Sequence, residues 1–243
     1  MENENILPSV LSRILYKSKV CLVINKCKGE TVEGAKENLS NLKKELTAVI
    51  GEKTELIEAV NRLDVPVTGC ALFAFTKASL SFLGRAFAGS YPVKKSYWAI
   101  VEKPLSIIPE SGELVHWISA NSSMNKSFAF NKSGPGRKKA VLRYRITGEG
   151  KNYLFTEIEL LTGRHHQIRA QFADIGLFIK GDLKYGAKRC EKDGGIRLHA
   201  RFLSFPDPLN KNKSISITAD PPQMDNLWQA MMESSILNNN HSF

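Results

Sequence analysis

Long apolar runs, paired cysteines and nucleotide-binding motifs are all missing from this sequence. No apolar run approaches the roughly 18 residues that a membrane-spanning helix needs, and the opening MENENILPSV lacks the basic-then-apolar pattern of a secretory signal. The four cysteines, Cys21, Cys27, Cys70 and Cys190, form no CxxC pair, so neither a disulfide framework nor a structural zinc site is indicated. We therefore expect a cytoplasmic protein with free thiols, no membrane partner, no metal and no cofactor.

Acidic residues are in the minority. The 243 residues include 34 Lys or Arg against 24 Asp or Glu, which gives a formal net charge of +10. Such an excess favours a polyanionic partner through counterion release and long-range steering. Nucleic acid is the leading candidate, although basic composition is also common in proteins that bind no nucleic acid.

The hydrophobic pattern predicts many short strands and a few helices. Strands are expected at 20–25, 70–75, 96–101, 114–119, 140–146, 153–160, 198–205 and 214–218. Helices are expected at 78–88, 167–175 and 224–232, and the buried face of a further helix is marked by Ala35, Leu39, Leu42, Leu46 and Val49. This mixture predicts an α+β fold with helices flanking a mixed, mainly antiparallel sheet.

No internal repeat or linker separates independent domains. We expect an extension at 1–13, one large domain at 14–236 and a disordered tail at 237–243. The clearest loop is 132–139 (KSGPGRKK), which combines Gly and Pro with four basic residues but lacks the spacing of a phosphate-binding P-loop. It suits either contact with phosphates or a solvated turn.

Three segments could carry chemistry, and the first is Asn61-Arg62-Leu63-Asp64, followed by Val-Pro-Val-Thr-Gly and an apolar strand. Pro66 and Gly69 interrupt regular structure, which predicts that Asp64 lies on a loop against a rigid strand. A carboxylate in that position can meet a substrate. Taken alone, an Asp beside Pro and Gly is more often a turn residue.

The second segment runs from Lys94 and Lys95 into the aromatic pair Tyr97-Trp98. Strand alternation places these two rings on opposite faces. If Tyr97 points into a cleft, its ring can stack on an extruded base and its hydroxyl can take part in proton transfer. The alternative is an aromatic core residue.

The third segment is 160–169, LLTGRHHQIR. Thr162 and Gly163 are typical of a helix entrance, so Arg164 and the first free N–H groups could jointly meet a phosphate. On such a helix His165 and Arg169 would share a face, from which Arg169 could reach a carboxylate. His165, His166, Cys190 and His199 lack zinc-ligand spacing, so metal binding is disfavoured.

Together these segments resemble the signature of the RluA-type pseudouridine synthases, enzymes that isomerise uridine in RNA. The resemblance spans roughly residues 14–222. It is carried by ILYKSKVCLVINKCKGE, NRLDVPVTG, KKSYWAIVEKP, LLTGRHHQIRAQFADIG, GDLKYG and IRLHARFLSFPDP. It implies the pseudouridine synthase fold for the domain at 14–236, with a sheet divided around a central basic cleft and no cofactor.

Carried over position by position, the resemblance implies that Asp64 is the catalytic aspartate, Tyr97 the active-site tyrosine and Arg169 the base that pairs with the aspartate. The implied substrate contacts, which would come from several elements, are Arg62, Lys95, Arg164, His165 and Leu198. Arg62 would help to displace the target base, Leu198 would line the uracil pocket, and Arg164 would hold RNA backbone.

The sequence departs from the family pattern at three places: Asn61 replaces the usual histidine, Val65–Thr68 replaces the commoner Arg-x-Thr-Ser, and Cys27 stands where proline is expected. None of these changes removes a catalytic group, but they bear on which RNA is bound. The expected partner is structured RNA, either tRNA or rRNA, and the expected state is a monomer. Two alternatives stay open: a catalytically silent RNA-binding or ribosome-assembly protein on the same fold, and a metal-dependent RNA enzyme.

Overall fold

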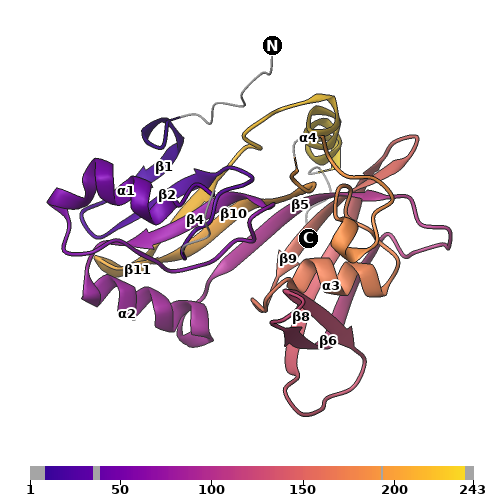
Figure 1. Ribbon diagram of the computed structural model, residues 1–243, viewed down its shortest axis with the longest axis horizontal. Helices are drawn as coiled ribbons and strands as arrows, with labels where there is room; N and C mark the ends of the chain where they lie inside the picture. The colour runs from indigo at the N-terminus through magenta and orange to yellow at the C-terminus, as the bar shows by residue number, and fades with distance from the viewer. Residues whose placement is uncertain (1–8, 35–38, 193, 239–243) are drawn as a thin grey trace. The chain divides into compact units, whose positions relative to one another are not determined.

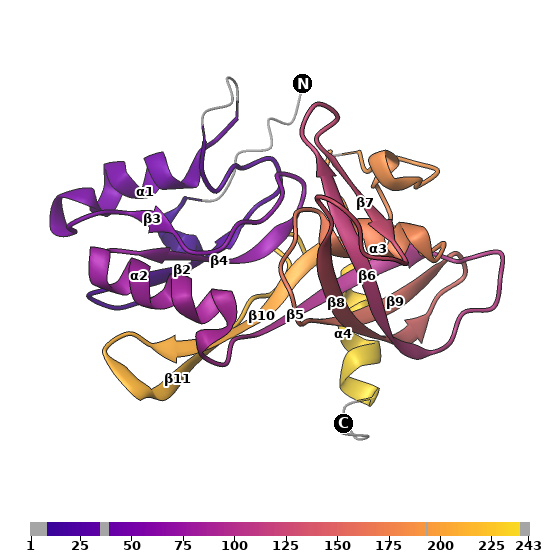
Figure 2. The ribbon, with the colours of Figure 1, turned by 90° about the horizontal axis from the view of Figure 1, so that it is seen from below.

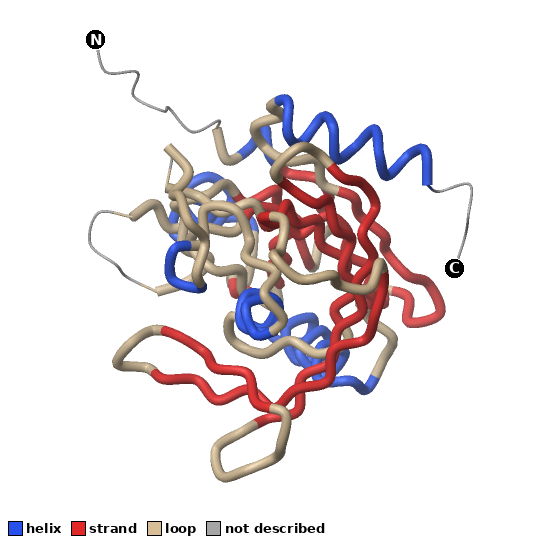
Figure 3. The backbone as a smooth tube through the Cα atoms, turned by 90° about the vertical axis from the view of Figure 1, so that its right-hand side faces the viewer, coloured by secondary structure: helices blue, strands red, loops and turns tan. Residues whose placement is uncertain are grey.

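The computed structural model describes residues 9–34, 39–192 and 194–238. Among the described residues more are in strands than in helices, as the red and blue segments of Figure 3 show. Every strand pair for which the register is defined is antiparallel. The expected α+β fold is confirmed.

The chain divides into two compact units. Unit 1 comprises residues 1–93 and 201–222, and unit 2 comprises residues 94–200 and 223–243. The division at 1–13, 14–236 and 237–243 that the sequence favours stays a prediction, and residues 239–243 lie outside the described part of the chain.

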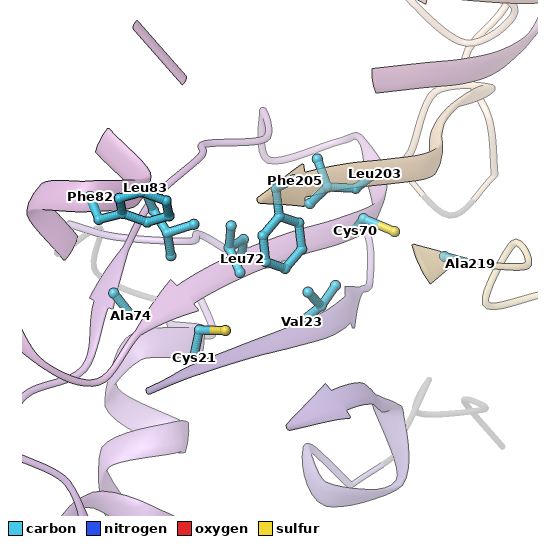
Figure 4. Close-up of a cluster of buried hydrophobic side chains, with 10 residues drawn as sticks. All are labelled: Cys21, Val23, Cys70, Leu72, Ala74, Phe82, Leu83, Leu203, Phe205 and Ala219. Carbon is cyan, nitrogen blue, oxygen red and sulfur yellow. The ribbon is translucent and has the colours of Figure 1, made fainter. Parts of the chain in front are cut away.

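Unit 1 is a sheet with two helices. Its strands are β1 (Ile14–Lys17), β2 (Cys21–Lys26), β3 (Glu58–Ala59), β4 (Thr68–Ala74), the Arg201–Asp207 part of β10 (Leu198–Asp207) and β11 (Asn210–Thr218). Its α-helices are α1 (Leu42–Ile50) and α2 (Lys77–Arg85) (Figure 1). One face of β2 and β4 packs against α2 through the cluster drawn in Figure 4, which includes Leu72, Phe82, Leu83 and Phe205. This cluster stabilises strand β4, which directly follows the loop that carries Asp64.

Local sequence explains where the two helices of unit 1 begin. The Asn41 side chain accepts from the Lys44 N–H, and Thr76 forms a capping box with Ser79. The sequence predicted that Leu39 belongs to the first of these helices, but Leu39 is not helical and the helix begins at Leu42. Ala35, which was predicted to lie on the same helix, is outside the described residues. Val49 is also not on the buried face. It is 47% exposed, because the buried side chains Leu42, Leu46 and Ile50 are spaced by four.

Unit 2 is a five-stranded sheet in the order β5-β9-β8-β6-β7. The strands are β5 (Lys94–Glu102), β6 (Ser111–Asn121), β7 (Lys126–Phe130), β8 (Lys138–Glu149) and β9 (Tyr153–Leu160), and the α-helices are α3 (Gln167–Asp174) and α4 (Asn226–Asn238). The α3 helix packs on strands β6 and β7 (Figure 2). On the opposite face of the sheet, Trp228 and Met231 of α4 pack on Trp98, Ile100 and Phe155.

Most sequence-based elements are confirmed within a few residues, but three strands were not expected. These are β1, β3 and β7, each of five residues or fewer. The four cysteines are free, as expected, and three of them are buried. Burial raises the pKa of the Cys70 thiol to about 12, which keeps it protonated and unreactive.

Candidate active site

A buried lysine, Lys26, donates hydrogen bonds to the backbone of the loop that carries Asp64. The Lys26 side chain is fully buried, and its ammonium donates to the carbonyls of Val65 at 3.0 Å, Val67 at 2.7 Å and Cys27 at 2.9 Å. The Gly29 N–H also donates to the Val65 carbonyl, and the Val67 N–H closes a turn on the Asp64 carbonyl. Four hydrogen bonds therefore fix the backbone from Asp64 to Val67, in agreement with the prediction that Asp64 lies on a supported loop.

Burial lowers the pKa of the Lys26 ammonium to about 8, and the charges of Glu30 and Asp64 act in the opposite direction. Glu30 is itself fully buried and forms a two-point ion pair with Arg13, with both N–O distances at 2.8 Å. Its Oε2 atom also accepts from the Cys27 N–H. Arg13, Glu30 and Lys26 thus form a buried charged cluster next to the loop, which the sequence did not predict.

Asn61 and Arg62 flank this loop in different ways. The Asn61 side chain donates to the Cys70 carbonyl at 3.2 Å and accepts from the Leu72 N–H at 2.7 Å, so it fastens the chain to strand β4. Arg62 is exposed. Asn61, which replaces the histidine of the family pattern, therefore has a structural role here, and the neighbouring guanidinium reaches solvent.

In unit 2, Tyr97 and Trp98 lie on opposite faces of β5, as expected. Tyr97 is in register with Ile158 and, through it, with Tyr144, whose ring meets Phe172 of α3 edge-on. Tyr97 is thus on the α3 side of the sheet and is 9% exposed. Leu198 is also buried, at the start of β10.

The segment 162–166 forms a turn instead of the first turn of a helix. Helix α3 begins at Gln167, after His166 in a left-handed conformation with φ of 52°. The expectation that Arg164 stands at a helix N-terminus is therefore wrong: its N–H is bonded to the Gln167 side chain at 2.9 Å, and its guanidinium donates to the Lys139 carbonyl. The shared helical face of His165 and Arg169 is wrong for the same reason.

Lys95 and Arg164 form a positively charged pair beside Gly163. Burial, with the charge of Arg164 as a second cause, lowers the pKa of Lys95. The Lys95 ammonium lies next to Gly163: a Cβ added at Gly163 would be 3.6 Å from Lys95 Nζ. Two neighbouring cations repel each other, and a bound anion would relieve this repulsion.

Arg169 has a partner that the sequence did not reveal. Its guanidinium donates to both carboxylate oxygens of Asp182, at 2.7 and 2.8 Å, and both side chains are at most 5% exposed. The guanidinium also lies 4.8 Å from the centroid of the Tyr185 ring. Asp182 and Tyr185 belong to the GDLKYG turn, so this motif orients Arg169 within unit 2.

A second group of contacts ties the same turn to strand β7. The Tyr185 hydroxyl accepts from the Ser127 N–H at 2.8 Å and lies 2.9 Å from His166 Nδ1, while His165 Nδ1 is 2.9 Å from the Ser127 hydroxyl. The two histidine rings stack at 3.8 Å. Burial and the positive charge of Arg169 lower the pKa of His166 to about 2, so it stays neutral. His165 therefore has a structural contact, and its predicted role toward substrate stays a prediction.

The predicted site residues fall in both units: Arg62 and Asp64 in unit 1, the others in unit 2. The structure brings together Lys95 with Arg164, and Arg169 with Asp182 and Tyr185. The pairing of Asp64 with Arg169 joins the two units and stays a prediction. Within the described residues, no group of three or more His, Cys, Asp or Glu side chains could hold a metal ion, and no helix is long and apolar enough to cross a membrane.

Comparison with known proteins agrees with these motifs. The family model for RNA pseudouridylate synthase matches residues 20–174, more than half of the chain. An uncharacterized RNA pseudouridine synthase of Zymomonas mobilis is 29% identical over 89% of this chain and 95% of its own length. The ribosomal large subunit pseudouridine synthase D of the same organism is 29% identical, over 91% of this chain and 73% of its own length.

Solved structures agree in fold. The human RNA pseudouridylate synthase domain containing 4 protein superposes with a TM-score of 0.67 at 22% identity, covering 93% of both chains. The human domain containing 1 protein gives 0.68 at 22% identity, covering 96% of this chain and 98% of its own. The chain has the fold of the pseudouridine synthases. It belongs to the RNA pseudouridylate synthase family, in the RluA group, and is an isomerase that acts on RNA.

Proposed function

We propose that this chain isomerises uridine to pseudouridine in structured rRNA or tRNA, with Asp64 as the catalytic carboxylate and without a cofactor. The observation that carries the proposal is the support of the Asp64 loop. A buried ammonium and a backbone N–H fix the carbonyls that follow Asp64, which holds a reactive group in one position on a rigid element.

The reaction needs a carboxylate but no external energy. The bond between uracil N1 and ribose carbon 1′ breaks, the base turns, and carbon 5 bonds to carbon 1′. Carbon 5 gives up a proton and N1 gains one, so product and substrate have the same atoms. Asp64 would act either as a nucleophile at carbon 1′ or as a base at carbon 2′.

The target base must first leave the helix, because no side chain can reach ribose carbon 1′ of a stacked nucleotide. Flipping costs a few kcal/mol, least in loops and distorted stems. Arg62 would help to displace the base, Tyr97 would stack on it, and Leu198 would line its pocket. Arg169 would pair with Asp64, while Lys95, Arg164 and His165 would contact the RNA beside the target.

The substrate proposal begins with rRNA. Two relatives, from Zymomonas mobilis and Buchnera aphidicola, carry names that specify the large ribosomal subunit. We therefore propose large-subunit rRNA as the first RNA to test and tRNA as the second, with the enzyme acting as a monomer.

Asp64→Asn should abolish pseudouridine formation while RNA binding stays within about threefold, because binding depends mainly on phosphate contacts. The measurement is tritium release from uridine labelled at carbon 5, together with pseudouridine mapping in cellular RNA with and without the gene. The matched control is Glu52→Gln, which neutralises an exposed carboxylate of the same unit. Pseudouridine formation by Asp64→Asn at a near-normal rate would disprove the assignment. A wild-type chain that binds RNA without forming pseudouridine would favour the silent RNA-binding protein.

A further inference from the structure

Strands β6 and β7 of unit 2 have one face covered by α3 and one open face. Strand β8, which also contacts α4, borders the open face at Lys139. On the covered face His116, Ala140 and Tyr144 pack toward α3, and Gln171 of that helix donates to the Leu114 and Ala140 carbonyls. Strand alternation turns the neighbouring residues to the other side. That side carries aromatic and basic residues, and we call it the outer face.

Three aromatic rings of the outer face come from neighbouring strands. Trp117 of β6 is directly opposite Phe130 of β7, and Phe128 is two residues from Phe130 on the same side. Phe128 is 38% exposed, and Trp117 and Phe130 are half-buried. Cross-strand and diagonal neighbours on one sheet face are close enough for their rings to form a single surface.

Positive charge surrounds these rings. The Lys126 ammonium, on the edge strand β7, lies 5.6 Å from the Phe128 ring centroid and 5.1 Å from the Tyr185 ring centroid. The Arg137 guanidinium lies 3.6 Å from the Phe130 ring centroid. Lys139 is opposite Trp117 on β8. Arg137 packs on both Phe130 and Gly134, since a Cβ added at Gly134 would be 3.2 Å from the arginine side chain. These contacts hold Arg137 beside the aromatic surface.

Few acidic residues occur in strands β6, β7 and β8 to balance the positive charge around the three rings. Between Glu113 and Glu149 there is no Asp or Glu, while seven Lys or Arg occur. Two of the seven, Arg143 and Arg145, form ion pairs with glutamates of β6 and β9. The other five are all in segment 126–139, next to the three rings, so the charge of the outer face complements a polyanion at this end.

We propose that the outer face binds unpaired nucleotides of the RNA substrate, with bases stacked on Phe128 and Trp117 and phosphates held by Lys126, Arg137 and Lys139. This inference rests on the proposed function only in taking RNA as the substrate. It adds a contact on the side of the unit 2 sheet opposite to Tyr97. Exposed rings between cations are the arrangement that binds single strands, because every base has a π-face and every nucleotide a phosphate.

The test measures binding of a fluorescent 12-nucleotide single-stranded RNA to the full chain, with its duplex for comparison. Phe128→Ala should weaken single-strand binding about tenfold and leave the dependence on salt unchanged, because it removes stacking and no charge. Phe128→Trp should restore binding. Leu105→Ala, which truncates a fully exposed apolar side chain of the same unit, is the matched control and should have no effect.

The charge of the outer face is tested separately. Lys126→Gln should reduce the slope of log affinity against log salt by about 0.7, the value for one phosphate contact on a single strand. Lys151→Gln, at an exposed position between β8 and β9, should leave the slope unchanged. Equal affinities of Phe128→Ala and Leu105→Ala for the single strand would overturn the proposal.

Contact between two copies of the chain is the competing role for the outer face. If wild-type chain self-associates in sedimentation, and Phe128→Ala prevents this without changing RNA affinity, the outer face is an interface between copies and the proposal is wrong. The binding series is repeated with Asp64→Asn. If Asp64→Asn still forms pseudouridine, the catalytic assignment of Asp64 is wrong. The binding proposal is judged separately, by the effect of Phe128→Ala on affinity for the single strand.

Discussion

Asp182, which the sequence analysis did not single out, forms a buried ion pair with Arg169. Its carboxylate accepts hydrogen bonds from Nε and Nη2 of Arg169, and removing one member of a buried ion pair leaves the other charge uncompensated. Because Arg169 is proposed to act on Asp64, Asp182 is a positioning residue for the reaction. It differs in this from the surface ion pairs of the chain, which contribute little.

Asp182→Asn should lower kcat by about tenfold to a hundredfold with little change in KM, because a displaced guanidinium affects the chemical step more than RNA binding. Steady-state kinetics on a defined RNA checks this. Glu157→Gln, which changes the half-buried partner of Arg145, is the matched control and should behave like wild type. If kcat of Asp182→Asn is unchanged while its resistance to urea falls, Asp182 is only structural.

Among the elements, the Asp64 loop depends on strand β2 through one side chain. Lys26→Met keeps an unbranched side chain of nearly the same length but leaves the carbonyls of Cys27 and Val67 without the ammonium that they accept from. We expect a loss of about 3 kcal/mol in the free energy of unfolding and a fall in kcat. Lys43→Met, which breaks a part-exposed ion pair with Glu58, should cost under about 1 kcal/mol. Equal losses in urea unfolding for both variants would contradict this.

The pH dependence of the Lys26 effect has a definite sign. The pKa of Lys26 is about 8 in the folded chain against an ordinary value of 10.5, so between these values the unfolded chain binds more protons. Stability from this group therefore rises with pH across that window, and Lys26→Met lacks the rise. Urea unfolding at pH 7.5 and pH 9.5 should show the gap between wild type and Lys26→Met widening with pH.

The elements also show where sequence patterns are reliable. Strand β9 and the start of α3 coincide with the predicted residues, because alternation and helical spacing are local properties. Strand β7 was not predicted, because its sequence KSFAF is short and contains two polar residues. Its pairing with β6 stabilises it as a strand. The first residues of α1 were misplaced because the Asn41 cap decides the start, not the apolar spacing.

At the scale of the whole molecule, the net charge of +10 makes RNA binding sensitive to salt. If about five phosphates are contacted, affinity for a single strand should fall about a hundredfold between 50 and 200 mM salt. Fluorescence anisotropy over that range measures the slope, and circular dichroism at each salt concentration confirms that the chain stays folded. A slope near zero would mean that charge does not drive binding.

The sequence by itself determined the family, the α+β class, most strands and the identity of the candidate catalytic residues, because these depend on local patterns and short motifs. Only the tertiary structure decided which side chains meet: Arg169 with Asp182, Arg13 with Glu30, and Lys26 with the loop carbonyls. Such partners are separated along the chain by 13 to 41 residues. Hydrogen bonds and ion pairs act over a few ångströms in space, so the folded chain alone brings these groups into range.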